Sequence, residues 1–104
     1  MYICFAEYKI RPEDKERYAA YTGSLLVQER YRNVHLYEGT DQPCLFVELW
    51  TAATAEEAEQ IKKERSDKRS PWYRVSEWIP GGAGKMHIWT FRPSGGRPLV
   101  IENP

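Results

Sequence analysis

The sequence has no excess of charge of either sign. Its 15 Lys and Arg residues are balanced by 15 Asp and Glu residues, so the formal net charge at pH 7 is zero. Proteins that bind nucleic acid or anionic membranes through bulk electrostatics need a strong positive excess. We therefore expect neither a nucleic acid nor a membrane among the partners of this protein.

Long apolar runs are also missing. No window approaches the roughly 18 apolar residues that a membrane-spanning helix needs. The first ten residues, MYICFAEYKI, contain no charged region ahead of an apolar run and no small-residue cleavage site of the kind found in signal peptides. This pattern predicts a soluble, cytoplasmic protein.

Metal-ligating side chains are scarce, because the chain has only two cysteines and two histidines. Cys4 and Cys44 lie in apolar segments far apart in the sequence, with no Cys-x-x-Cys pattern and no Cys/His cluster. A free cysteine in such a segment usually behaves as a small buried hydrophobe. We expect no metal site and no cofactor.

Alternating and continuous apolar segments predict four strands, at residues 2–10, 33–38, 44–50 and 85–91. A helix is predicted over residues 12–29, because Pro12 suits a first helical position and apolar residues then recur at helical spacing. A second helix begins at Thr54, where Thr54 and Glu57 have the spacing of a capping box. Ser70 and Pro71 predict the start of a further short helix.

The resulting order, β-α-β-β-α-β, predicts an α+β fold with a ferredoxin-like antiparallel sheet and both helices on one face. We assign residues 1–92 to this single domain and residues 93–104 to a Pro/Gly-rich C-terminal tail. Such a sheet should alternate apolar and polar residues. The third strand instead has Leu45, Val47 and Leu49 on one face and Phe46 and Trp50 on the other. The second face needs a cover, which a homodimer supplies by symmetry.

The segment VELWTAATAEEA, in which Glu48-Leu49-Trp50 ends the third strand and Glu57-Ala58 opens the helix, resembles the dimeric α+β barrel superfamily. Within it the chain is similar to the antibiotic-biosynthesis-monooxygenase-like (ABM-like) domains over residues 1–92. The resemblance implies a dimeric α+β barrel. Haem-degrading members of the family carry a histidine on the second helix and an asparagine on the first strand, and this sequence has neither.

Glu48 is the candidate catalytic residue, because burial among apolar neighbours raises the pKa of a carboxylate and can make it a general base. The alternative is a structural carboxylate paired with an arginine or lysine, or hydrogen bonded to a tyrosine. Glu7 on the first strand has the same two interpretations. The candidate substrate-binding residues are Trp50, Trp72, Trp78, Tyr37 and His87.

These aromatic residues have alternative roles as well. Tyrosines suit an ordinary core or interface, and His35 and His87 are expected on opposite edges of the sheet. Trp72, Val75, Trp78 and Ile79 share one face of the short helix, so Trp72 either borders a pocket or closes it.

Two functions follow. The first is a cofactor-independent monooxygenase, or a binder of a small aromatic or apolar molecule. The second is a non-enzymatic homodimer, structural, regulatory or stress-related, whose cavity is filled by its own side chains.

Overall fold

The structure is a computed structural model that describes residues 1–97 and 99. Residues 98 and 100–104, which belong to the predicted tail, lie outside the described residues. No helix in the described part of the chain is long and apolar enough to cross a membrane.

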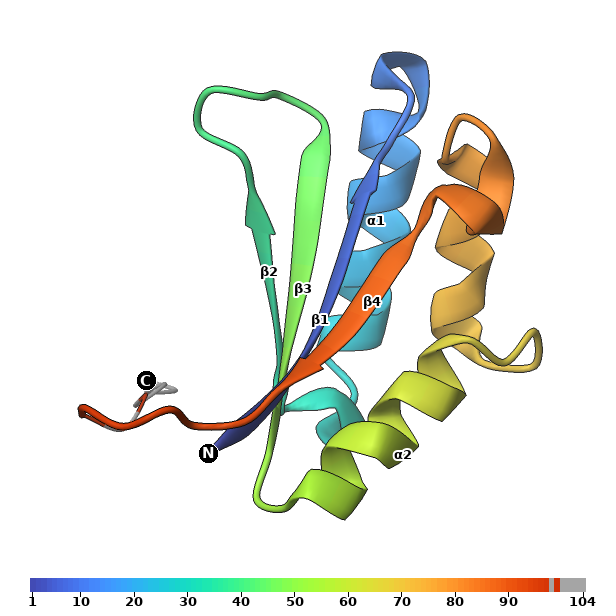
Figure 1. Ribbon diagram of the computed structural model, residues 1–104. Coiled ribbons are helices and arrows are strands. Elements are labelled where there is room, and N and C mark those ends of the chain that lie inside the picture. The colour runs from blue at the N-terminus through green and yellow to red at the C-terminus, as the bar shows by residue number, and fades with distance from the viewer. Residues whose placement is uncertain (98, 100–104) are drawn as a thin grey trace.

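Four antiparallel strands form one sheet in the order β2-β3-β1-β4 (Figure 1). Their bounds are β1, Tyr2–Lys9; β2, Val34–Glu38; β3, Leu45–Ala52; and β4, His87–Phe91. The order places β1 and β3 in the centre and puts the two histidine-bearing strands at the edges. The ferredoxin-like α+β fold predicted from the element order is therefore confirmed.

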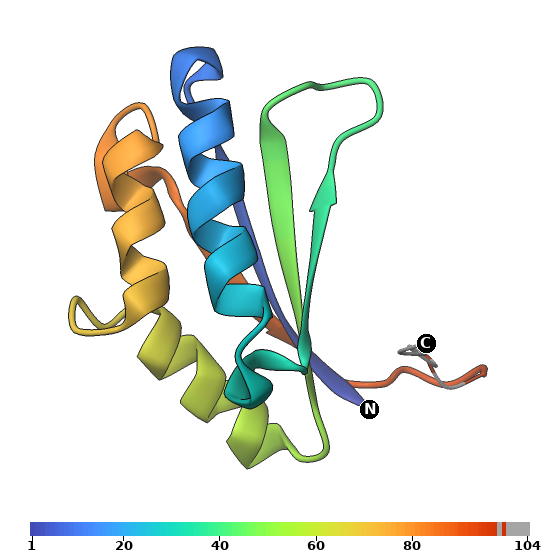
Figure 2. The ribbon, with the colours of Figure 1, turned by 180° about the vertical axis from the view of Figure 1, so that it is seen from behind.

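Two α-helices, α1 (Lys15–Leu26) and α2 (Ala55–Arg65), lie on the same face of the sheet, and Figure 2 shows that face from the helix side. A 3-10 helix, η3 (Pro71–Trp78), packs beside α1. Shorter 3-10 turns are η1 (Pro12–Asp14), η2 (Glu29–Tyr31) and η4 (Gly82–Lys85). Within residues 1–97 and 99, no helix lies on the opposite face of the sheet (Figures 1 and 2).

The first helix is shorter than predicted, and this boundary was wrong at both ends. Pro12–Asp14 forms a 3-10 turn, and the α-helix ends at Leu26 because Gln28 takes an extended conformation, with φ −79° and ψ 132°. The predicted periodicity extended to residue 29 because Leu25, Leu26 and Glu29 share a helical spacing. Helix ends are set by such local backbone choices more than by the apolar pattern.

The predicted capping residues are confirmed. The Thr54 hydroxyl accepts a hydrogen bond from the Glu57 backbone N–H at 3.1 Å, and the Glu57 carboxylate accepts one from the Ala53 N–H at 2.9 Å. Ser70 accepts from the Trp72 N–H at the start of η3. A 3-10 helix has three residues per turn, so Trp72, Val75 and Trp78 fall on one face, and all three are buried.

Candidate functional site

The helix-covered face of the sheet contains a buried ion pair. Glu48 on β3 and Arg65 at the end of α2 are 0% and 1% exposed. The Glu48 carboxylate accepts hydrogen bonds from Arg65 Nε at 2.6 Å and from Arg65 Nη2 at 2.7 Å. This two-point contact fixes both side chains in one geometry.

Two aromatic side chains complete the coordination of Glu48. The Trp50 indole N–H donates to Glu48 Oε1 at 2.9 Å, and the Tyr8 hydroxyl donates to Glu48 Oε2 at 2.5 Å. Because the Tyr8 proton is used in this way, the Tyr18 hydroxyl must donate its own proton to Tyr8 across their 2.8 Å contact. Each oxygen of Glu48 therefore accepts two hydrogen bonds.

The pKa values in this cluster follow from burial and from the carboxylate. Burial, and then the negative charge of Glu48, raise the pKa of the Tyr8 hydroxyl well above its ordinary value. Burial raises the pKa of Tyr18 as well. Burial alone would lower the pKa of Arg65, but the adjacent Glu48 carboxylate raises it overall. Arg65 is therefore charged, and both phenols stay protonated.

This arrangement matches the alternative considered for Glu48, a structural carboxylate bound to an arginine and a tyrosine. All of its acceptor positions are occupied, so a substrate proton would reach it only after the ion pair opened. Sequence analysis missed Arg65. It occupies the apolar face of α2 at helical spacing from Ala58 and Ile61, and an arginine on that face was the signal that a buried carboxylate lay opposite.

The three predicted tryptophans are buried in the layer between the sheet and the helices. Trp50, Trp72 and Trp78 are 6%, 1% and 4% exposed. The Trp50 and Trp72 rings meet edge to face with their centroids 5.3 Å apart, and Tyr31 packs against both of them. The layer between sheet and helices is thus filled by side chains at these positions.

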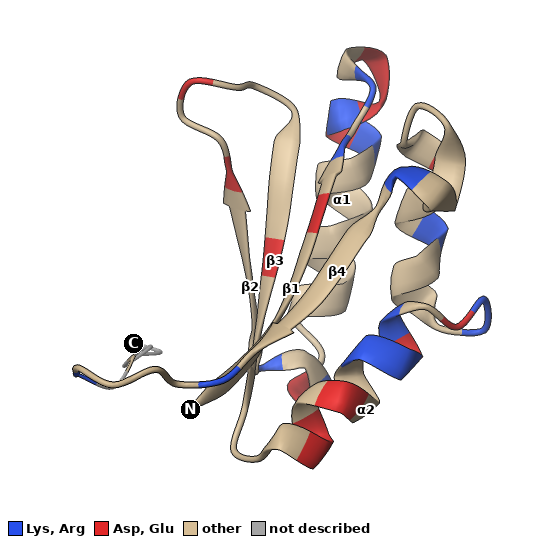
Figure 3. Ribbon diagram, in the orientation of Figure 1, with Lys and Arg blue, Asp and Glu red and all other residues tan. Residues whose placement is uncertain are grey.

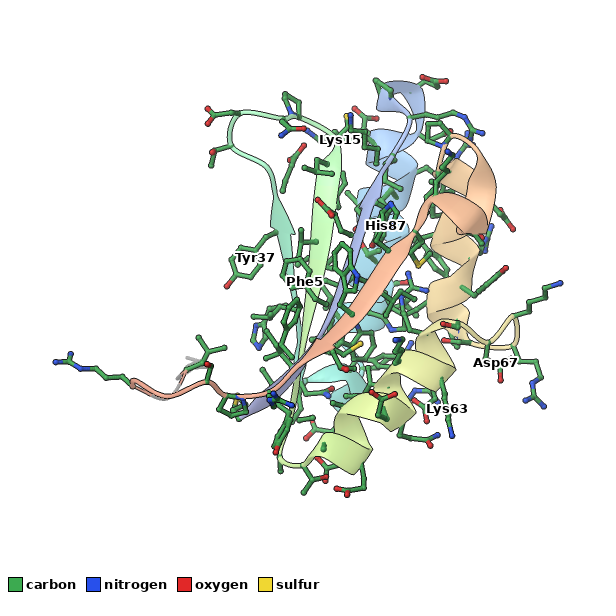
Figure 4. All side chains as sticks on the ribbon, viewed as in Figure 1. Phe5, Lys15, Tyr37, Lys63, Asp67 and His87 are labelled. Carbon is green, nitrogen blue, oxygen red and sulfur yellow. The ribbon has the colours of Figure 1, made fainter. Side chains whose placement is uncertain are left out.

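The remaining predicted residues, Tyr37 and His87, lie on the other face of the sheet, which we call the open face. Strand register places Ile3, Phe5 and Glu7 of β1 on this face, together with alternate residues of the other strands. Tyr37 on β2 points away from the helices, on the side where Phe5 lies (Figure 4). Tyr37 and His87 occupy opposite edge strands, so the structure does not bring them together.

The open face is apolar and partly exposed. Tyr37, Trp89 and Phe91 are 57%, 45% and 48% exposed. The Phe5 and Phe91 rings pack edge to face with their centroids 6.1 Å apart. Charged residues gather on the helices and loops, and few lie on the strands (Figure 3). A contiguous exposed patch of this kind marks a binding surface more often than an ordinary surface.

A cavity of about 320 Å³ lies where β4 leaves β1. The ladder between these strands ends at the pair Glu7 and His87, and beyond it the chain turns into η4. The cavity is lined by Glu7, Tyr8, Lys9, Leu45, Ile79, Pro80, Lys85 and His87. It combines an apolar wall with a few charged or polar groups, which is the usual composition of a small-molecule site.

Solved structures with the same architecture include several monooxygenase-named proteins. One titled antibiotic biosynthesis monooxygenase superposes with a TM-score of 0.64 at 15% identity, over 91% of this chain and 100% of that chain. The fold is ABM-like. A candidate antibiotic biosynthesis monooxygenase from Nitrosomonas europaea gives 0.62 at 14% identity, over 91% of this chain and all of that chain.

A NIPSNAP family protein from Agrobacterium tumefaciens strain C58 superposes on this chain with a TM-score of 0.66 at 15% identity, over 95% of this chain and 98% of that one. No protein-family model matches the chain, and no curated protein matches it. Identities this low support the fold alone. The chemistry of this chain therefore has to be argued from its own residues.

Proposed function

We propose that this protein is a cytoplasmic homodimer that binds a small aromatic or apolar molecule in the cavity beside Glu7 and His87. The observation that carries the proposal is the position of this cavity. Its volume, about 320 Å³, is within the range of small-molecule sites. Leu45, Ile79 and Pro80 supply an apolar wall to this cavity.

The homodimer is supported by the open face. The half-buried side chains of Phe5, Val47 and Leu49 and the exposed rings of Trp89 and Phe91 form an apolar surface on a sheet whose other face is already covered. A second copy packed through the same surface would cover it by two-fold symmetry. Because Glu7, Lys9 and His87 share this side of the sheet, the partner would also cover the mouth of the cavity.

Binding is tested with 2-naphthol, followed by isothermal titration calorimetry. We expect saturable binding to the unaltered protein. The substitution Leu45→Trp should abolish binding because it fills the cavity, whereas Val27→Trp should leave it unchanged, since Val27 is 84% exposed and lies at the end of α1. Equal binding to the two variants would place the site elsewhere. Sedimentation showing only monomers at high micromolar concentration would contradict the homodimer.

The filled layer around Glu48 favours the second function, a non-enzymatic structural or regulatory dimer. Glu48, Trp50, Trp72 and Trp78 are all buried there, and both oxygens of the carboxylate already accept hydrogen bonds from protein side chains. The absence of binding by neutral aromatic probes to an intact dimer would support this second function over the first.

The monooxygenase names of the fold neighbours are the reason to test an oxidation as well. Oxygen consumption with an electron-rich phenol and no added cofactor would support a cofactor-independent monooxygenase. Catalysis by Glu48 remains a prediction, and it requires the bonds to Arg65 to open. Loss of oxygen consumption in Glu48→Gln with retained folding would support that role.

A further inference from the structure

Three charged side chains border the cavity. Lys9 and Glu7 come from β1, and Lys85 comes from the end of η4. None of the three takes part in an ion pair within residues 1–97 and 99. Two positive charges and one negative charge thus meet at one small cavity without being neutralised by each other or by described neighbours.

Glu7 lies opposite His87 in the strand ladder, and neither lysine has this position. The two residues are direct partners in the β1–β4 ladder, so their Cβ atoms are neighbours on the open face. The His87 ring is in turn stacked on Trp89, with an angle of 8° between the planes and centroids 5.6 Å apart. Glu7 and His87 therefore form one side of the cavity mouth, and the two lysines remain available to a ligand.

Lys85 is positioned by a glycine. Gly81 has φ +88°, and a Cβ at that residue would lie 2.7 Å from Lys85 Cγ and 3.3 Å from Lys85 Cε. The alkyl chain of Lys85 consequently lies directly against the Gly81 backbone. This contact limits the rotamers of a side chain that would otherwise be free, so less entropy is lost when its ammonium group binds an anion.

We propose that the ligand of this cavity is a small organic acid that carries a single carboxylate. Its carboxylate would bind between Lys9 and Lys85, and its apolar or aromatic body would lie against Leu45, Ile79 and Pro80. Glu7 opposes a second negative charge on the ligand, which favours a monoanion over a dianion. This inference rests on the proposed binding function and specifies its ligand class.

The test compares 1-naphthoate with its neutral analogue 1-naphthamide, because the two probes share one ring system and differ in charge. Titration calorimetry should show at least about tenfold tighter binding of the naphthoate, the combined effect of two partly exposed charge contacts. Lys85→Gln and Lys9→Gln should each weaken naphthoate binding about threefold to fivefold and leave naphthamide binding unchanged. Lys63→Gln, on the exposed side of α2, is the matched control and should change neither (Figure 4).

The outcomes separate the inference from the proposed function. Failure of both probes to bind would overturn the binding function and this inference together. Equal affinity for the two probes would overturn the inference alone. Inorganic phosphate that competes as well as naphthoate would also overturn it, because phosphate makes no use of the apolar wall. If the two Lys→Gln variants shift only the dissociation of the dimer, the lysines serve the interface, and the inference is again overturned.

Discussion

Two glutamates, one on each face of the sheet, have opposite environments although their positions in the strand ladder are adjacent. Ala6 pairs with Glu48, and Glu7 pairs with Val47. Glu48 points toward the helices and is bound by Arg65, Tyr8 and Trp50, whereas Glu7 is half-buried on the open face beside a cavity. One step in the strand ladder therefore separates a carboxylate bound within the core from one that borders a cavity.

The comparison extends to the faces themselves. On the helix-covered face the polar atoms of Glu48, Tyr8 and Tyr18 are all hydrogen bonded within the core. On the open face, apolar rings share the surface with Glu7 and Lys9, neither of which forms an ion pair with another described residue. The hydrogen-bonded polar groups of the covered face stabilise the fold. The exposed apolar surface of the open face can still be buried against a partner or a ligand, which would be favourable.

The largest expected effect comes from breaking the buried ion pair. Arg65→Met leaves Glu48 charged and without its main partner, so we expect the free energy of unfolding to fall by about 3–5 kcal/mol. Urea denaturation followed by tryptophan fluorescence measures this change. Lys63→Met on the same helix is exposed and should cost less than about 0.5 kcal/mol. A similar small cost for Arg65→Met would mean that the pair contributes little to stability.

The next effect belongs to the open face. Trp89→Glu places a charge in the apolar surface, and we expect the dissociation constant of the dimer to rise by at least about 100-fold, or about 3 kcal/mol. Sedimentation velocity over a concentration series measures it. Val27→Glu makes the corresponding change at an exposed apolar residue on the helix side, and should leave dimerisation unaltered. Equal effects of the two variants would show that the dimer does not form through the open face.

The two faces of the sheet could largely be predicted from the sequence. Poor alternation of apolar and polar residues within residues 44–50 predicted two apolar faces, and the element order predicted the sheet topology that the structure confirms. The pattern of apolar residues could not predict which groups contact each face of the sheet. Glu48 and Glu7 received the same two interpretations, because the partner of Glu48 lies 17 residues away on a helix whose apolar face is weak.

The cavity could not be predicted from the sequence either, and the reason is geometric. It forms where β4 separates from β1, and the η4 turn that causes the separation follows from the left-handed backbone of Gly81 and Gly82. The glycine-rich segment predicted only the end of a helix before the last strand. Of its neighbours, His87 was among the predicted ligand-binding residues, while Lys9 and Lys85 had no signal in the sequence that distinguished them from surface lysines.

Alkaline pH should lower the free energy of unfolding, because buried groups on the helix-covered face of the sheet hold their protons only in the folded state. Burial, and then the charge of Glu48, raise the pKa of the Cys4 thiol to about 11 from an ordinary value of 9.0. The unfolded chain loses this proton above pH 9 while the folded chain keeps it, so stability is complete below pH 9 and falls as pH rises toward 11.

The loss assigned to Cys4 across this window is on the order of 2–3 kcal/mol. It is measured as the free energy of unfolding in urea between pH 7 and pH 11. Tyr8 and Tyr18, whose pKa values are also raised by burial, add to the decline above pH 10. Cys4→Ala should remove the part that begins near pH 9, and Cys44→Ala, at a partly exposed position before β3, should retain it. The same pH profile in both variants would contradict the assignment to Cys4.

The smallest effect concerns the loop that positions Lys85 at the open-face cavity. In Gly81→Ala the new methyl group meets the Lys85 side chain, and an L-residue must hold φ at +88°. We expect stability to fall by about 1–2 kcal/mol, measured by urea denaturation. Gly84→Ala is the control, because a Cβ there meets nothing within 4 Å. The two variants also separate loop strain from ligand contact: if Lys85 binds the carboxylate, Gly81→Ala weakens 1-naphthoate binding and spares 1-naphthamide, whereas an effect on both probes would mean that the loop shapes the cavity wall instead.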